Sequence, residues 1–119
     1  MDLNDWIEKL KAEQPYIIVE GLKDKRALST LGLKKIITLK APLYKIVEKV
    51  AAETKEVIIL TDLDREGKKL FARLRKDLQK HRVRIDNKFR EFLFRETKLR
   101  QIEGITKYIS KFDNSTGRW

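Results

Sequence analysis

The chain has 119 residues, a length typical of a single domain, and its 28 Lys and Arg against 18 Asp and Glu give a formal net charge of +10 at pH 7. It has no Cys and one His, His81, which excludes disulfides and thiolate zinc sites and argues against a histidine-based metal site or a catalytic triad. No apolar run approaches the roughly 18 residues of a membrane helix, and the acidic N-terminus does not resemble a signal peptide, so we expect a cytoplasmic protein without a membrane span.

The first half of the chain alternates helical and strand patterns. Apolar residues at helical spacing, β-branched runs and the positions of Pro and Gly set the expected boundaries. The apolar run over 16–20 is typical of a buried strand, and it ends in Glu20 followed by Gly21. The expected elements are a helix over residues 3–12, a strand over 16–20, a helix over 23–32, a strand over 35–39 and a helix that begins at Pro42.

The second half is organised around an apolar strand that starts at Glu56 and runs into an acidic turn. A helix is expected after Gly67, ending at about Lys80. The remaining expected elements are a short strand over 83–86, helices over 88–98 and 102–111, and a loose tail over 113–119. Strands alternating with helices predict an α/β, Rossmann-like fold with about four mainly parallel strands and helices on both faces of the sheet.

Three carboxylates at alternate positions, Asp62, Asp64 and Glu66, follow the central strand. Since successive side chains of a strand point to opposite faces, Asp62 and Asp64 are expected on one side, and Glu66 can join them where the helix begins. Ligands of such sheets bind beyond the carboxyl ends of the strands, so Glu20 should join this cluster if the first and third strands are neighbours. Oxygen ligands of this kind suit Mg²⁺. An acidic turn or a solvated helix N-terminus would give the same pattern.

The positive charge is confined to one half of the chain. Residues 1–64 carry 11 Lys and Arg against 11 Asp and Glu, whereas residues 65–119 carry 17 against 7. One face of the helix after the acidic turn carries four cations at helical spacing: Lys69, Arg73, Lys76 and Lys80. A one-sided basic excess is typical of a protein that binds a polyanion, although a charged stripe is also the ordinary appearance of a solvated helix face.

Two motifs give the chain a resemblance to a known family. The strand end Val19-Glu20-Gly21, followed by Thr61-Asp62-Leu63-Asp64-Arg65-Glu66-Gly67, resembles the Toprim domain of topoisomerases, bacterial-type primases and certain nucleases. The chain looks most similar to the small stand-alone Toprim proteins of archaea and bacilli. On this resemblance the chain divides into an N-terminal packing helix over 1–13, a Toprim domain over 14–112 and the tail over 113–119.

The resemblance also implies roles for the acidic residues. Glu20 corresponds to the family's general acid or base, Asp62 and Asp64 to the aspartates that hold Mg²⁺, and Glu66 to a third carboxylate of the metal cluster in type IA topoisomerases. The match has departures: Lys68 replaces an acidic residue of those topoisomerases, Leu22 separates the first glycine from Lys23, and the 38–41 loop lacks a common glycine.

The resemblance reduces the number of reactions to consider, but it does not decide whether the protein is an enzyme. A topoisomerase needs a nucleophilic tyrosine on a separate domain and a primase needs a zinc module, and this chain has room for neither. The leading hypothesis is therefore Mg²⁺-dependent phosphodiester chemistry on RNA or DNA, with Mn²⁺ able to replace Mg²⁺ and with Glu20, Asp62 and Asp64 as catalytic residues. The alternative is a non-catalytic module that uses the same site to dock nucleic acid or a partner enzyme.

Several basic residues are expected to hold the nucleic acid. Arg65 lies between two carboxylates, where it can contact phosphate or form an ion pair with Glu66 or Asp24. The helical stripe would bind the phosphate backbone and make the affinity depend on salt. The expected nucleic-acid-binding residues are Lys23, Arg65, Lys69, Arg73, Lys76 and Lys80.

Overall fold

The computed structural model describes residues 2–108. Its elements alternate along the chain as the sequence predicts. In order they are α1 (Leu3–Glu13), β1 (Tyr16–Val19), α2 (Leu22–Thr30), β2 (Ile36–Thr38), α3 (Leu43–Glu53), β3 (Glu56–Ile59), α4 (Arg65–Lys80), β4 (Arg84–Ile85), α5 (Lys88–Glu96) and the 3₁₀ helix η1 (Ile102–Gly104).

The four strands form one parallel sheet in the order β2-β1-β3-β4. In β1, Ile17 pairs with Ile36 of β2 on one side and with Ile58 of β3 on the other. The chain therefore moves outward from β1 to β2 and then returns to the other side of β1 to form β3. The strand order reverses between β1 and β3, and this is the place where open α/β sheets bind ligands.

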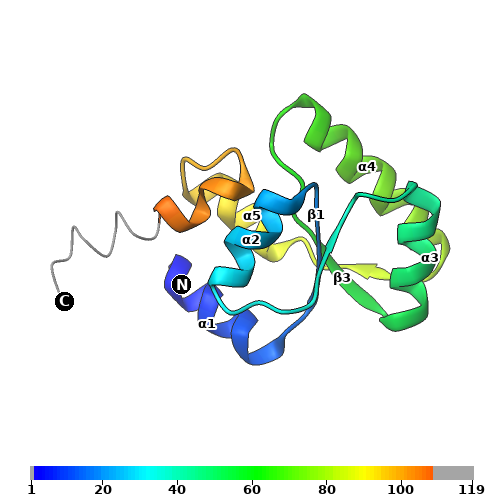
Figure 1. The fold of residues 1–119 in the computed structure, drawn as a ribbon, viewed down its shortest axis with the longest axis horizontal. Coiled ribbons are helices and arrows are strands. Elements are labelled where there is room, and N and C mark those ends of the chain that lie inside the picture. The colour runs from blue at the N-terminus through cyan, green and yellow to red at the C-terminus, as the bar shows by residue number, and fades with distance from the viewer. Residues whose placement is uncertain (1, 109–119) are drawn as a thin grey trace, which may run out of the picture.

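Helices cover both faces of the sheet, and each face has its own core. Ile17 and Ile58 point into a core shared with α1, α2, α5 and η1, whereas Ile18 and Ile59 point into a second core shared with α3 and α4. Figure 1 shows the first group of helices on one side of β1 and β3, and the second group on the other. Each fully buried Ile or Leu stabilises the fold by about 1.5–3 kcal/mol. The predicted α/β class with a four-stranded parallel sheet is confirmed.

The N-terminal helix belongs to the same core as the sheet. Leu3, Ile7 and Leu10 of α1 are buried, and the ring of Trp6 lies 5.5 Å from that of Phe89 in α5. The helix begins with a capping box, in which the side chains of Asp2 and Asp5 each accept a hydrogen bond from the backbone N–H of the other. The packing helix expected at 1–13 is therefore an integral part of the fold as far as the structure describes it.

Several predicted boundaries differ from the structure. The helix expected after Gly67 begins two residues earlier, because Asp64 caps it by accepting a hydrogen bond from the Gly67 N–H. The last strand and α5 are shorter than expected. The helix expected over 102–111 begins as the 3₁₀ turn η1 and continues as α-helix over 105–108, while its end and the predicted tail lie outside the described residues.

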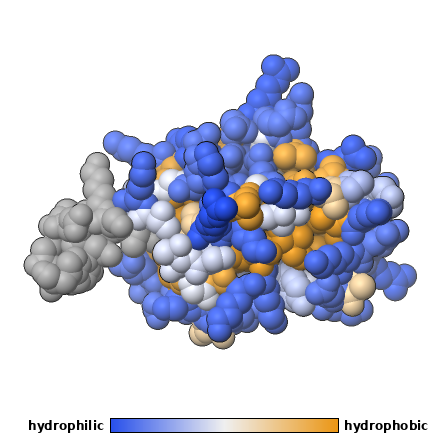
Figure 2. Space-filling model, viewed as in Figure 1, coloured by the Kyte–Doolittle hydropathy of each residue, from blue (hydrophilic) through white to orange (hydrophobic). Residues whose placement is uncertain are grey.

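The surface of the described part of the chain is mainly hydrophilic. Figure 2 shows mostly polar side chains on the face in view, with apolar surface exposed between α2 and α3, where the edge strand β2 lies. Within residues 2–108, no helix is both long enough and apolar enough to cross a membrane.

Candidate carboxylate site

Glu20 joins the ends of the two central strands. It directly follows β1, and its Oε2 accepts a hydrogen bond of 2.7 Å from the backbone N–H of Asp62, in the loop that follows β3. The Leu60 N–H donates to the Ile18 carbonyl at 2.8 Å, which extends the pairing of the two strands beyond β3. Glu20 therefore fixes the beginning of the acidic loop at the switch point of the sheet.

Asp62 lies in this loop and not in the strand, which ends at Ile59. The alternation of strand side chains therefore does not position Asp62 and Asp64, contrary to the sequence-based argument. Instead, Asp62 Oδ1 accepts a 2.8 Å hydrogen bond from the Ile102 N–H, and the Leu63 N–H donates to the Arg100 carbonyl at 2.8 Å. The segment that leads into η1 thus forms one wall of the site.

Asp64 and Gly67 fix the start of α4. Asp64 Oδ1 accepts a hydrogen bond of 2.7 Å from the Gly67 N–H, and the Thr61 hydroxyl donates to the Gly67 carbonyl at 2.7 Å. A Cβ atom on Gly67 would lie 2.0 Å from the carbonyl oxygen of Asp62. Glycine is required here because the first turn of α4 packs directly on the backbone of the acidic loop.

Arg90 of α5 holds the acidic loop in place through hydrogen bonds, a role that was not predicted from the sequence. Its side chain donates to the carbonyl of Thr61, to the Thr61 hydroxyl at 3.3 Å and to the carbonyl of Asp62 at 3.4 Å. The guanidinium carbon lies 4.5 Å from the ring centre of Phe71 and 5.1 Å from that of Phe94. Only 8% of Arg90 is exposed, so it cannot serve as a surface contact for nucleic acid.

One signal in the sequence could have identified Arg90. It occupies the inward face of an amphipathic helix between the buried residues Phe89 and Leu93. A charged residue in such a position is almost never fully buried unless it has polar partners. The sequence does not reveal that these partners are the carbonyl groups of the acidic loop.

Burial, together with neighbouring negative charges, raises the pKa values of Glu20 and Asp62. Burial is the main cause that raises the pKa of Glu20, and the negative charges of Asp62, Asp64 and Asp24 add to it, while the hydrogen bond from the Asp62 N–H acts in the opposite direction. Burial likewise raises the pKa of Asp62, with contributions from Asp64 and Glu103, against the opposing effects of the Ile102 N–H and Arg90. The site thus gathers negative charge that the protein only partly compensates.

Asp24 adds a fourth carboxylate beside this cluster. It is buried in the first turn of α2, and its Oδ2 accepts a 3.0 Å hydrogen bond from the Gly21 N–H. Burial raises its pKa, and the charges of Asp62 and Glu103 raise it further. Its main described role is to cap α2 directly after Glu20.

The donor atoms of the site suit a hard divalent cation. Glu20, Asp62 and Asp64 each use one oxygen to accept a backbone hydrogen bond, and within residues 2–108 the other oxygen of each accepts none. In the same range, no three Asp, Glu, His or Cys side chains are already gathered closely enough to hold a metal ion. Mg²⁺ is usually held by one or two carboxylates together with water and phosphate. The residues present therefore fit a site with one or two protein ligands.

The remaining predicted residues at the mouth of the site are exposed. Arg65 and Glu66 are the first two residues of α4, and Lys23 lies in the first turn of α2. Glu66 is not among the charges that raise the pKa values of Glu20 and Asp62. Within the described part of the chain, the ion pair considered for Arg65 is not present.

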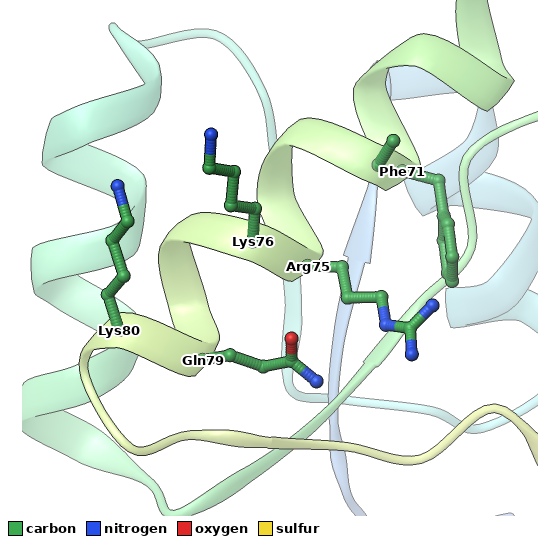
Figure 3. A pocket seen from close by; sticks show the side chains of 6 residues that line it. Phe71, Arg75, Lys76, Gln79 and Lys80 are labelled. Atoms are coloured by element: carbon green, nitrogen blue, oxygen red, sulfur yellow. The ribbon is translucent and has the colours of Figure 1, made fainter.

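The predicted cationic stripe lies on the exposed side of α4, opposite the buried Leu74 and Leu78. Its members do not behave alike: the Nε of Arg73 forms an ion pair of 3.4 Å with Asp77, one turn further along. Lys76 and Lys80 instead border an open pocket of about 500 Å³ together with Phe71, Arg75 and Gln79. Figure 3 shows that Arg75 and Gln79 project from a different side of the helix than Lys76 and Lys80. Arg75 therefore adds a cation that the predicted stripe did not include.

A parallel sheet with a glutamate after one central strand and an Asp-x-Asp loop after its neighbour defines a class of nucleic-acid-related, metal-binding domains. The model of the Toprim domain family matches residues 15–92, and the chain belongs to this family.

Relatives of similar size support this membership. The chain is 35% identical over 108 residues to a UPF0292 protein from Methanocaldococcus jannaschii, with 87% of this chain and 84% of the relative covered. It is 41% identical over 101 residues to a UPF0292 protein from Thermococcus gammatolerans, with 83% and 74% covered. A solved structure of a protein from Aquifex aeolicus is similar with a TM-score of 0.79 and 31% identity, covering 86% of this chain and 96% of that one.

Proposed function

We propose that this protein performs Mg²⁺-dependent phosphodiester chemistry on nucleic acid, as a nuclease that processes RNA or nicks DNA. The observation that carries the proposal is the hydrogen bond from the Asp62 N–H to Glu20, which joins a proton-transfer candidate to the loop of two aspartates at the switch point. The negative charge of these carboxylates, which the protein only partly compensates, supports a cation there. Such a protein would meet its substrate in the cytoplasm.

The carboxylates divide the work between binding and proton transfer. Asp62 and Asp64 would hold the ion, with Glu20 and Glu66 as further carboxylates beside it, and Mn²⁺ would serve in place of Mg²⁺. When bound, the ion supplies Lewis-acid chemistry by polarising the phosphate and stabilising charge on the leaving oxygen. Glu20 has a raised pKa, so it can hold a proton nearer to neutral pH than an ordinary glutamate. This property suits a group that activates water or protonates the leaving oxygen.

Basic residues around the site would bind the substrate. Lys23 and Arg65 lie in the first turns of the two helices that leave the site, where helix dipoles also favour phosphate. The α4 cations would hold the backbone further away. The ligand that this arrangement supports is the phosphate backbone of nucleic acid.

A second candidate function is a binding module without catalysis, which docks nucleic acid or a partner enzyme. Two observations favour it. No three potential ligands are already gathered within residues 2–108, and Oε2 of Glu20 is engaged by the Asp62 N–H. A structural role of Glu20 in holding the loop would by itself account for that hydrogen bond.

A cleavage assay separates the two functions. The purified protein is incubated with labelled single-stranded, duplex and structured RNA and DNA in Mg²⁺, Mn²⁺ or EDTA. We expect products only with metal, and we expect none from Asp62→Asn or Asp64→Asn. Glu20→Gln should bind substrate as the parent does, because its amide oxygen can still accept the hydrogen bond from the Asp62 N–H. It should fail to cut the substrate, because an amide cannot act as a general acid or base.

The matched control is Glu8→Gln, since Glu8 is exposed on α1, away from the site, where it forms an ion pair with Lys11. This variant should cut at the rate of the parent. Tight binding without products in any metal would favour the binding module. Titration calorimetry tests the ligands directly: if Asp64→Asn bound Mg²⁺ as tightly as the parent, the proposed ligand set would be wrong.

A further inference from the structure

Two open pockets adjoin each other beside the carboxylate site. One has a volume of about 470 Å³ and is bordered by Asp64 of the site together with Lys98, Arg100, Gln101 and Gly104. The other has a volume of about 550 Å³ and lies between α2 and the η1 region, bordered by Lys23, Arg26, Gln101, Gly104, Thr106 and Lys107. Both pockets are bordered by Gln101 and Gly104, so they are neighbours, and we call the two together the η1 groove.

The wall of the η1 groove is held firmly against the site. The segment before η1 is bound to the acidic loop by the hydrogen bonds from the Leu63 N–H to the Arg100 carbonyl and from the Ile102 N–H to Asp62. Ile102 and Ile105 are fully buried in the core that also contains Ala27 and Leu28 of α2. The groove is therefore a fixed extension of the carboxylate site and not a separate surface.

The η1 groove is strongly positive. Five exposed cations border it, against the two acids Asp64 and Glu103, and none of the five forms an ion pair within residues 2–108. These cations are Lys23, Arg26, Lys98, Arg100 and Lys107. Unpaired cations gathered around neighbouring surface pockets are the electrostatic arrangement that binds a phosphate backbone.

We propose that the η1 groove binds the phosphate backbone of the nucleic acid as it leaves the carboxylate site, on the side of the sheet opposite α4. This inference rests on the proposed nucleic-acid function and adds the path of the strand. No aromatic residue borders the groove among the described residues, so it offers no platform for base stacking. The groove therefore binds backbone without regard to sequence.

The test compares two pairs of charge removals, one inside the η1 groove and one outside it. The groove variant is Arg26→Gln with Lys107→Gln, and the control is Lys25→Gln with Lys34→Gln, which removes two exposed cations that do not border either pocket. Binding of short labelled single strands, of mixed sequence and of single-base composition, is measured by fluorescence anisotropy in EDTA at several salt concentrations. Circular dichroism verifies that both variants are folded.

We expect the groove variant to flatten the slope of log affinity against log salt by about 1.4, because each lost contact to a single strand removes about 0.7. Near physiological salt the affinity should fall roughly tenfold, equally for all base compositions. The charge-preserving variant Arg26→Lys with Lys107→Arg should keep the parent slope. The control pair should change the slope by less than half as much as the groove pair.

Other outcomes would overturn the proposal. If the groove pair and the control pair had the same slope and affinity while the parent bound nucleic acid, the η1 groove would not carry the strand, and the proposed function would stand. If the parent bound no nucleic acid at any salt concentration, the proposed function and the role of the groove would both be wrong.

Discussion

At the scale of single residues, the site depends on groups that act through the backbone of the acidic loop. Arg90 donates to the carbonyls of Thr61 and Asp62, and Glu20 accepts from the Asp62 N–H, so the loop is held from both sides. Burial lowers the pKa of Arg90, while the charges of Asp62 and Glu20 raise it. The acidic cluster therefore helps to keep this buried cation charged.

We predict that Arg90→Met destabilises the fold, because it leaves buried carbonyl groups of the loop without donors. Each buried polar group left without a partner costs about 1–3 kcal/mol. The matched control is Arg95→Met on the same helix, where the side chain is exposed and a change of about 0.5 kcal/mol or less is expected. Urea unfolding measures both variants, and an equal effect of the two would contradict the role of Arg90.

The raised pKa of Glu20 gives a prediction for stability against pH. When the pH is below the ordinary glutamate pKa of 4.5, the Glu20 carboxyl is protonated in both the folded and the unfolded state, and its contribution to stability is fully present. As the pH rises through the raised value, the folded state must give up a proton that it binds more tightly than the unfolded chain, and stability is lost.

Glu20→Gln removes this loss. The melting temperature of the variant minus that of the parent should therefore grow as the pH rises above about 4.5, the ordinary glutamate value, until the pH exceeds the raised pKa of Glu20. Thermal unfolding followed by circular dichroism in a series of buffers tests this. A difference that stayed constant or shrank with rising pH would mean that ionised Glu20 does not destabilise the fold.

At the scale of elements, the junction between β3 and α4 determines the geometry of the site. Sequence patterns predicted a strand, an acidic turn and a helix in this order, but they placed Gly67 before the helix because glycine commonly ends or precedes one. The structure has Gly67 inside the first turn, where the helix packs on the carbonyl of Asp62. Such a close approach cannot be predicted without knowing how the helix crosses the loop.

We predict that Gly67→Ala destabilises the protein, although in a helix interior Ala is ordinarily more stable than Gly by about 1 kcal/mol. A Cβ atom at this position would overlap the backbone of Asp62, and overpacking of this kind costs about 1–3 kcal/mol. Gly21→Ala is the control, because its backbone is extended and no atom lies within 4 Å of the added Cβ. Denaturant unfolding should separate the two, and a neutral Gly67→Ala would disprove the packing argument.

At the scale of the whole molecule, the sequence predicts the class of fold and the acidic residues of the site, but not the contacts that hold those residues in place. Apolar runs and helix signals are local, so the α/β alternation and the four parallel strands could be predicted from them. The support of the site could not, because Arg90 and Ile102 reach the acidic loop from positions 28 and 40 residues further along the chain. The pattern over 102–111 predicts a helix, but nothing in it signals the contact with the acidic loop.

The last prediction concerns the two basic surfaces on opposite sides of the sheet. Lys76 and Lys80 lie on α4, which covers one face, whereas Arg26 and Lys107 border the η1 groove on the other. Arg73 is less suitable for substitution because it already pairs with Asp77. If one strand passes over the carboxylates and contacts both surfaces, removing either pair of charges weakens the same complex.

We therefore expect the losses in binding free energy caused by Lys76→Gln with Lys80→Gln and by Arg26→Gln with Lys107→Gln to add within about 0.3–0.5 kcal/mol in the quadruple variant, since distant sites are usually independent. A strand too short to span both surfaces should respond to only one of the pairs. Anisotropy titrations with a series of strand lengths measure this. The contrary result would be a parent protein that binds two strands at once, with each pair of substitutions removing one of them. The two surfaces would then bind different molecules, and no single strand would pass over the site.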